Sequence, residues 1–228
     1  MAVEQFLMNT HFTALSITTG QRWVALHNDN GESGTGTVDN GNAGNAGQIS
    51  DLVQLGDLET WQNVESPMQQ PDNRMVVNSE GKLYAWGRNN SGCLGLGDTT
   101  QRTSPVQVGT DTDWLEGGCF GSQSGAVKTD GTLWLWGFNG LGTIAQGNVN
   151  DVYSSPVQAG TDTDWAHLLM QPGGSLAVAM KTDGSIYASG YLDSVGATRL
   201  SNMAQLGDQD GFVDAVLCGS SAVFWKEA

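Results

Sequence analysis

Two stretches of the sequence decide the fold: SPVQVGTDTDW, from Ser104 to Trp114, and SPVQAGTDTDW, from Ser155 to Trp165. Ten of their eleven positions are identical, at a spacing of 51 residues, and chance does not produce such agreement. Weaker copies lie upstream as LVQLGDLETW, from Leu52 to Trp61, and downstream as AQLGDQDGF, from Ala204 to Phe212. The chain therefore contains four internal repeats, and a fixed period of this length is the signature of repeat architectures.

A second motif recurs in phase with the first. It reads KTDGTLWLWG at 128–137, KTDGSIYASG at 181–190, NSEGKLYAWG at 78–87 and TTGQRWVAL at 18–26. In each copy an alternating segment follows a pair such as Asp-Gly, which is the turn chemistry of a β-hairpin. The turn glycines are expected to have positive φ, a conformation that strains other residues. They are Gly20, Gly81, Gly131 and Gly184.

Composition favours the same fold class. Charged residues make up only 14% of the chain and 32 of its 228 residues are glycine, which argues against long helices. The repeat divides into four short strands, with 132–137, 156–159, 164–169 and 175–181 as the template. Four strands in a repeat of this length are typical of a propeller blade. We therefore predict an all-β chain that forms a β-propeller of about four blades, each of four antiparallel strands.

The whole chain, residues 1–228, is expected to form a single propeller domain. The repeats are placed at approximately 20–80, 81–130, 131–183 and 184–228. The strand type that precedes the hairpin turn occurs five times and the other three types four times, which gives seventeen strands, with the extra one within residues 1–19. An unpaired strand edge is a liability in water. Self-association, or docking onto other structural proteins, is therefore expected.

The tryptophans and cysteines are interpreted as packing residues. Tryptophans recur in phase and are expected to be wedges between blades rather than a ligand platform. They are Trp61, Trp86, Trp114, Trp136 and Trp165. Cys93, Cys119 and Cys218 are scattered and lack the C-x-x-C spacing of a zinc site, so we expect reduced thiols in the core.

Catalytic patterns are scarce in the sequence. The three histidines, His11, His27 and His167, lie at no metal-ligand spacing with another ligand. The glycine run at 92–97 follows a strand and opens no helix, so it is interpreted as a turn rather than a nucleotide-binding loop. We predict no catalytic residues, no cofactor and no metal, and therefore no enzymatic activity.

Paired aspartates precede two of the tryptophans. They are Asp111 with Asp113, and Asp162 with Asp164. Such pairs bind calcium in some proteins, and in others they form turns by accepting hydrogen bonds from backbone amides. The turn is preferred because no further acidic ligand accompanies either pair, and calcium stays the alternative.

The charge of the chain excludes several partner classes. The formal net charge is −15, which repels the phosphate backbone of nucleic acids. The apolar stretches are far shorter than the roughly 18 to 20 residues that span a bilayer, so no membrane insertion is expected. The N-terminal residues have neither a basic n-region nor an apolar h-region, and no cleaved secretory signal is expected.

Departures from the repeat are the expected places for specific function, because loops tolerate change. Residues 28–50 include six glycines and five asparagines and form a segment eight residues longer than its counterpart in the second repeat. A second insertion, 62–73, carries two prolines. Solvated loops without a binding role are the alternative. The candidate interaction residues in these segments are Asn28, Asn40, Asn45, Pro67 and Pro71.

The segment WGRNNSGCLGLGD at 86–98, followed by SPVQVG and KTDGTLWLWG, resembles the repeats of the regulator of chromosome condensation family. The resemblance implies a β-propeller, which in that family usually has seven blades, whereas this chain has residues for four. Ala25 and Ser189 stand at the wedge position in the weaker repeats. The best-known member is a guanine-nucleotide exchange factor that binds nucleosomes. The charge opposes nucleosome binding, and positions of the family's blade histidines hold other residues here, such as Gln123 and Gly174.

The repeats look like those of the bacterial and bacteriophage branch of the family. The leading hypothesis is a non-enzymatic structural or adhesive propeller, a bacteriophage virion protein of the tail, baseplate or capsid surface, made in the host cytoplasm and acting through protein–protein contacts. The alternative is a soluble cytoplasmic propeller that binds a surface glycan or a protein partner. A guanine-nucleotide exchange factor is the third hypothesis.

Overall fold

The structure is a computed structural model, and it describes residues 72–149, 151–169, 176–192 and 198–206, and as strands alone 12–15, 22–25, 53–54, 214–218 and 221–225. Every regular element within these residues is a β-strand. They contain no helix that is long and apolar enough to cross a membrane. The predicted all-β class is therefore confirmed.

The described residues form sixteen strands in five antiparallel sheets. The first sheet holds β1 (Phe12–Leu15), β2 (Arg22–Ala25) and β3 (Val53–Gln54), and the second holds β4 (Asn73–Val77), β5 (Leu83–Gly87) and β6 (Arg102–Gln107). The third holds β7 (Trp114–Cys119), β8 (Gln123–Lys128), β9 (Leu133–Phe138) and β10 (Val152–Gln158). The fourth holds β11 (Trp165–Leu168), β12 (Leu176–Lys181), β13 (Ile186–Leu192) and β14 (Thr198–Gln205). The last pairs β15 (Asp214–Cys218) with β16 (Ser221–Trp225).

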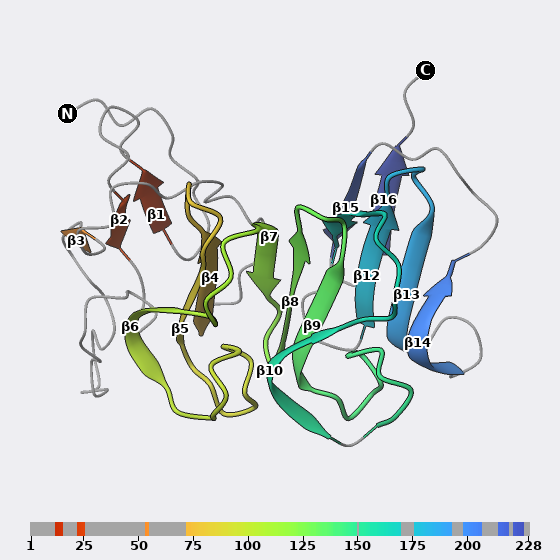
Figure 1. The fold of residues 1–228 in the computed structure, drawn as a ribbon, viewed down its shortest axis with the longest axis horizontal. Coiled ribbons are helices and arrows are strands. Elements are labelled where there is room, and N and C mark those ends of the chain that lie inside the picture. Colours follow the sequence, from red (N-terminus) through yellow and green to blue (C-terminus); the bar gives the residue numbers. More distant parts are fainter. Residues whose placement is uncertain are drawn as a thin grey trace.

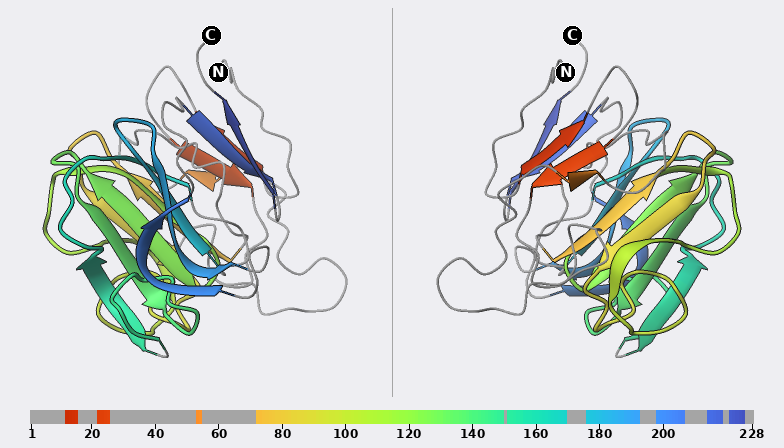
Figure 2. Two further views of the ribbon diagram at one scale, coloured as in Figure 1. Left: turned by 90° about the vertical axis from the view of Figure 1, so that its right-hand side faces the viewer. Right: turned by 90° about the vertical axis from the view of Figure 1, so that its left-hand side faces the viewer.

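The five sheets follow one another along an arc (Figure 1). Strands β6 and β10 lie on its outer side, while β4 packs against β7, and β8 against β11. The second, third and fourth sheets thus contact one another in turn as propeller blades do. The strands β1 and β2 overlap β15 and β16 in the turned views of Figure 2 but lie on the opposite side of Figure 1. Among the described residues, the arc is therefore open between its first and last sheets.

The predicted grouping of strands into blades is wrong, because it begins each blade at the wrong strand. The template took β9 to β12 as one blade, whereas β9 and β10 pair with β7 and β8, and β11 and β12 pair with β13 and β14. One sheet thus spans residues 114–158, across the boundary between the predicted repeats 81–130 and 131–183. A periodic sequence looks alike from any starting point, and only the hydrogen bonds between strands determine where a blade begins.

The predicted strand types are found in chain order. The N-terminal strand expected within residues 1–19 is β1, and it pairs with β2 so that Phe12 lies opposite Ala25. The strands that precede the hairpin turns are deeply buried, and β4 and β8 are buried at every position. Sixteen of the seventeen predicted strands thus have a described counterpart. The remaining one, near Trp61, lies outside the described residues.

The hairpin turns explain why the two sequence motifs recur together. Gly131 has φ +78°, as predicted, and a Cβ there would lie 2.1 Å from Thr163 O in the next blade. Gly131 O accepts a hydrogen bond from Trp165 N at 3.0 Å, and Gly81 O accepts one from Trp114 N at the same distance. The Asp-Gly turn of one blade therefore docks against the DTDW segment of the next. Only glycine fits this close approach.

The phased tryptophans are packing residues, as predicted. Trp86, Trp114, Trp136 and Trp165 are buried, and Trp61 lies outside the described residues. Trp136 is completely buried and packs with Leu94 and Val108 of the preceding blade. Its Nε1 donates a hydrogen bond to Cys93 O at 2.9 Å. Trp136 is therefore a wedge that joins β4–β6 to β7–β10.

The next interface, between β7–β10 and β11–β14, has no indole at this position. Ser189 is equivalent to Trp136 in the repeat and is also completely buried. Its Oγ donates a hydrogen bond to Thr143 O at 2.8 Å. Thr143 is equivalent to Cys93. Serine thus makes the hydrogen bond that the indole makes in the preceding interface.

The residue opposite the wedge also differs between the two interfaces, and it is larger where the wedge is smaller. A Cβ added to Gly95 would lie 2.8 Å from Trp136 Nε1, which is closer than atoms pack. The equivalent residue opposite Ser189 is Ala145, which carries that methyl group at φ +56°. A large wedge therefore requires glycine, whereas a small wedge accommodates alanine.

Candidate functional site

Three positions recur on one edge of the described blades, and we call them the rim residues. Each follows the glycine near the end of the strand after a blade's hairpin turn, and they are Arg88, Phe138 and Tyr191. The Arg88 side chain is 49% exposed, Phe138 is 41% exposed, and Tyr191 is partly buried. The edge of neighbouring blades therefore presents a cation and two aromatic rings in equivalent places.

A glycine positions each rim residue. Gly137 has φ +101°, and a Cβ there would lie 2.3 Å from Ser122 O. Because this approach is so close, the next residue can bond the same carbonyl, and Phe138 N donates to Ser122 O at 2.9 Å. Arg88 N donates to Asp72 O in the same way at 2.8 Å. The backbone beneath the rim is thus fixed.

The guanidinium group of Arg88 is held on two sides. Its Nη1 donates to Asp72 Oδ2 at 3.1 Å. In the amide orientation that satisfies both groups, the Asn90 oxygen accepts from Arg88 Nε at 3.1 Å and from Nη2 at 3.2 Å. These bonds use three of the five N–H groups of a guanidinium and leave one on each terminal nitrogen. A side chain already held in place loses little freedom when it binds a partner.

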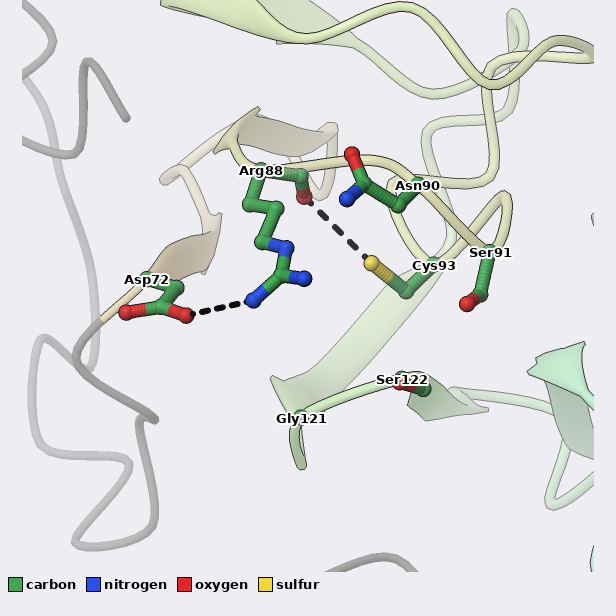
Figure 3. A pocket seen from close by; sticks show the side chains of 7 residues that line it. All are labelled: Asp72, Arg88, Asn90, Ser91, Cys93, Gly121 and Ser122. Atoms are coloured by element: carbon green, nitrogen blue, oxygen red, sulfur yellow. Dashed lines mark hydrogen bonds and ion pairs between the residues drawn. The ribbon is translucent and has the colours of Figure 1, made fainter. Parts of the chain in front are cut away.

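A cavity of about 100 Å³ opens beside Arg88 (Figure 3). Its walls come from Asp72 before β4, from the segment after β5 and from the turn between β7 and β8, so it lies between two blades. The lining residues are Asp72, Arg88, Asn90, Ser91, Cys93, Gly121 and Ser122. Sites for small-molecule substrates usually have about 300 to 1,000 Å³. The cavity therefore has room for one group the size of a side chain.

Cys93 lines this cavity but is no activated nucleophile. Burial raises its pKa to about 11, although the hydrogen bond from Asn73 opposes this shift. Burial also raises the pKa of Cys119, which is completely enclosed. Both are free buried thiols, as predicted, and the side chain of Cys218 lies outside the described residues. A thiol of such high pKa is protonated at neutral pH and reacts poorly.

The aspartate pairs lie at the opposite edge of the blades, where each binds the lysine of the hairpin motif. Asp111 and Asp113 bind Lys128, and Asp162 and Asp164 bind Lys181. Lys128 Nζ lies 2.6 Å from Asp111 Oδ2 and 3.1 Å from Asp113 Oδ1. The sequence interpretation as turn formers missed these ion pairs. Within the described part of the chain, no three potential ligands are grouped around a metal position, and calcium stays an untested alternative.

Each of these lysines also lies against aromatic rings. Lys128 Nζ is 4.8 Å from the ring centroid of Trp114 and 5.0 Å from that of Trp134. Burial by itself would lower the pKa of Lys128, but the hydrogen bonds and charges of the two aspartates outweigh it and raise the pKa. The lysine therefore stays charged and stabilises its own blade through cation–π contacts and ion pairs.

The candidate interaction residues predicted from the sequence lie outside the described residues. They are Asn28, Asn40, Asn45, Pro67 and Pro71. The rim residues were missed, because loop length drew the prediction to the insertions. A usable signal was present at the position after the Trp-Gly pair, where the repeat keeps its frame but Arg88 is replaced by Phe138.

Comparison with known proteins agrees with this geometry. The family described as "Regulator of chromosome condensation (RCC1) repeat" matches residues 80–117. The chain is 36% identical over 84 residues to the Protein RCC2 homolog of Danio rerio, which covers 36% of this chain and 17% of that protein. It is 37% identical over 98 residues to the X-linked retinitis pigmentosa GTPase regulator of Homo sapiens, which covers 41% of this chain and 10% of that protein. The chain spans less than a fifth of the length of these relatives.

Solved structures share the fold over the whole chain. Prp20p of Saccharomyces cerevisiae matches with a TM-score of 0.75 and 16% identity, covering 99% of this chain and 56% of that one. Human WBSCR16 matches with a TM-score of 0.74 and 18% identity, covering 100% of this chain and 58% of that one. At these identities the likeness is one of fold. Residues 80–117 therefore match a repeat of the regulator of chromosome condensation type, in a chain that folds as blades of a β-propeller.

Proposed function

We propose that the chain is a non-enzymatic binding module that holds a protein partner on its rim. One observation carries this proposal: an exposed arginine and an exposed phenylalanine, Arg88 and Phe138, occupy equivalent places on neighbouring blades. Arginine and aromatic residues are enriched among the residues that dominate protein–protein binding energy.

The rim is a continuous surface. The cavity beside Arg88 ends at Ser122, whose carbonyl accepts the hydrogen bond from Phe138 N. Phe138 lies opposite Val152 in the pairing of β9 with β10, and Val152 is 51% exposed. The charge of Arg88, the cavity and the apolar surface of Phe138 and Val152 therefore lie next to one another. Protein interfaces also combine charged and apolar groups in this way.

The chemistry of the described residues supports binding rather than catalysis. The cavity has the volume of one side chain, and the thiol beside it is kept protonated by burial. The structure of Prp20p was reported with its binding to Gsp1p and histones, and yeast RCC1 was solved bound to Kap60. Protein partners of those neighbours support the same partner class for this chain.

The narrower form of the proposal is the bacteriophage one, with the chain placed in a virion and associating with itself or other structural proteins. It rests on the style of the repeats and on the open arc of sheets. Co-sedimentation with purified particles tests it, and a strictly monomeric protein that stays in the supernatant contradicts it. A glycan-binding role rests on no described residue.

Partner capture from the native host extract tests the rim itself. The full chain is compared with a rim variant, Arg88→Ala with Phe138→Ala, and with a matched control, Lys82→Ala with Leu115→Ala. The control removes a cation and an apolar residue that is 46% exposed, and neither is a rim residue. We expect the same partner on the wild type and the control, and binding at least about 30-fold weaker on the rim variant. A partner held equally by all three proteins contradicts the proposal.

A further inference from the structure

The cavity beside Arg88, which we call the Arg88 cavity, has hydrogen-bonding groups that the fold does not use. Arg88 keeps one N–H on each terminal nitrogen after its bonds to Asp72 and Asn90. Among the described residues, neither the Ser91 nor the Ser122 hydroxyl has a hydrogen-bond partner in the structure, and both line the cavity. The two N–H groups donate, and the two hydroxyls can donate as well as accept, so a ligand with an acceptor oxygen fits.

The cavity also offers an acceptor. Asp72 uses Oδ2 for Arg88, which leaves Oδ1 without a partner among the described residues. The carboxylate is 40% exposed and lies on the same wall as the guanidinium. A ligand that carries an acceptor and a donor a short distance apart can therefore bond both members of this ion pair.

Electrostatics decides between a charged and an uncharged ligand. The charge of Arg88 is already balanced by Asp72 at 3.1 Å, and the chain as a whole carries −15. An anion would place a second negative charge beside Asp72, in a protein whose field repels it. An uncharged group avoids both penalties and still satisfies the free N–H groups.

From these observations we propose that the Arg88 cavity receives an amide group of a protein partner, either an Asn or Gln side chain or a main-chain peptide group. The amide oxygen accepts from Arg88, and the amide N–H donates to Asp72. A volume of about 100 Å³ suits one such group. This inference rests on the proposed function, because it specifies what the partner places between Arg88 and Phe138.

Titration with small amides in NMR tests the inference without a partner. Acetamide, N-methylacetamide and acetate are added separately to the ¹⁵N-labelled full chain, and the amide signals of Gly121 and Ser122 are followed. We expect saturable shifts with an amide and at least about threefold weaker binding of acetate. Acetamide represents the side-chain source and N-methylacetamide the main-chain source, so the stronger of the two identifies which group the partner supplies.

Two variants make the test specific. Arg88→Met keeps the aliphatic stem but removes the donors, and we expect amide binding to weaken about three- to tenfold, the factor for one ordinary hydrogen bond. Arg102→Met is the matched control, since Arg102 is bound to Asp98 at 2.7 Å and does not line the cavity. Stronger binding of acetate than of amides, no saturable shift, or equal losses in both variants would overturn the inference. Loss of partner capture on Phe138→Ala alone would still support the proposed function, so the two can fail separately.

Discussion

The two interfaces that flank the blade β7–β10 solve one packing problem in different ways. On the side of β4–β6, the indole of Trp136 fills the space and bonds Cys93 O, and Gly95 leaves room for it. On the side of β11–β14, Ser189 makes the equivalent bond to Thr143 O. The hydrogen bond from the wedge to a buried carbonyl is retained while the volume of the wedge is not, and Cys93 O also accepts from Ser124 Oγ at 2.7 Å.

The lysine sites, in contrast to the wedges, are alike in the two blades. Lys128 and Lys181 each contact two aspartates and two aromatic rings, although the rings are Trp114 and Trp134 in one blade and Trp165 and Tyr187 in the other. This arrangement lies within a blade, whereas the wedge lies between blades. Of these two side-chain arrangements, the one inside a blade is therefore kept, and the one between blades varies in a compensating pair.

The largest expected effect comes from giving the interface between β4–β6 and β7–β10 the serine wedge of the next interface. Trp136→Ser leaves a cavity where a completely buried indole packed, and we expect a loss of about 4 kcal/mol in the free energy of unfolding. Urea denaturation measures it. Adding Gly95→Ala to this variant should cost less than the same substitution costs in the wild type, because the methyl group enters space that the indole has left. An equal cost in the two backgrounds would show that Gly95 and Trp136 are independent.

Gly95→Ala in the wild-type background tests the same pair from the other side. The new Cβ would lie 2.8 Å from Trp136 Nε1, and φ at this position is +75°. Steric clash and left-handed strain together are expected to cost about 2 kcal/mol. The urea midpoint should fall without a change in slope. A variant as stable as the wild type would mean that the wedge does not require glycine.

Lys128→Met and Lys181→Met should behave alike, in contrast to the wedges. Because their aspartate partners are about half exposed and screened by solvent, we expect a loss of about 1 kcal/mol from each at neutral pH. The pKa of Lys128 is raised above its ordinary value of 10.5 by its aspartates, so its contribution is complete below that pH. It is lost as pH rises through the higher pKa of the folded state. Unfolding free energies at pH 7 and pH 11 measure this, and a difference from wild type that grows with pH contradicts it.

The smallest effect is expected at Ala145, which has φ +56° opposite Ser189. Ala145→Gly removes left-handed strain but gives up a buried methyl group and adds freedom to the unfolded chain. We expect a gain of about 0.5 kcal/mol, measured as a slight rise in melting temperature. A loss of more than about 1 kcal/mol would show that the methyl group fills the space beside Ser189.

The sequence was sufficient for the class of fold, because its motifs record contacts that recur. The Asp-Gly turn and the DTDW segment repeat together since Gly131 O bonds Trp165 N, so their spacing predicted stacked units. The replacement of Trp136 by Ser189 was visible in the sequence, but its compensation by Ala145 was not. Those two residues are 44 positions apart and meet only across an interface between blades.

The candidate site was harder to predict. Arg88 and Phe138 differ in chemistry, and although the repeat places them at equivalent positions, it does not say that their side chains are exposed at one edge. That knowledge requires the positive φ of Gly87 and Gly137, which places the following residues against Asp72 O and Ser122 O. The cavity has the same origin, since its walls come from segments about thirty positions apart that meet between two blades.

The hydrogen bond from each Asp-Gly turn to the next DTDW segment has a consequence for how such chains lengthen. Because the bond joins only adjacent units, duplicating any stretch of one full period in the gene inserts a unit whose two ends already match its neighbours, wherever the cut falls. Recombination must then insert a whole period, whereas its cut sites need not coincide with the ends of a sheet. Arrays of this kind can gain or shed a unit without redesign of the remainder.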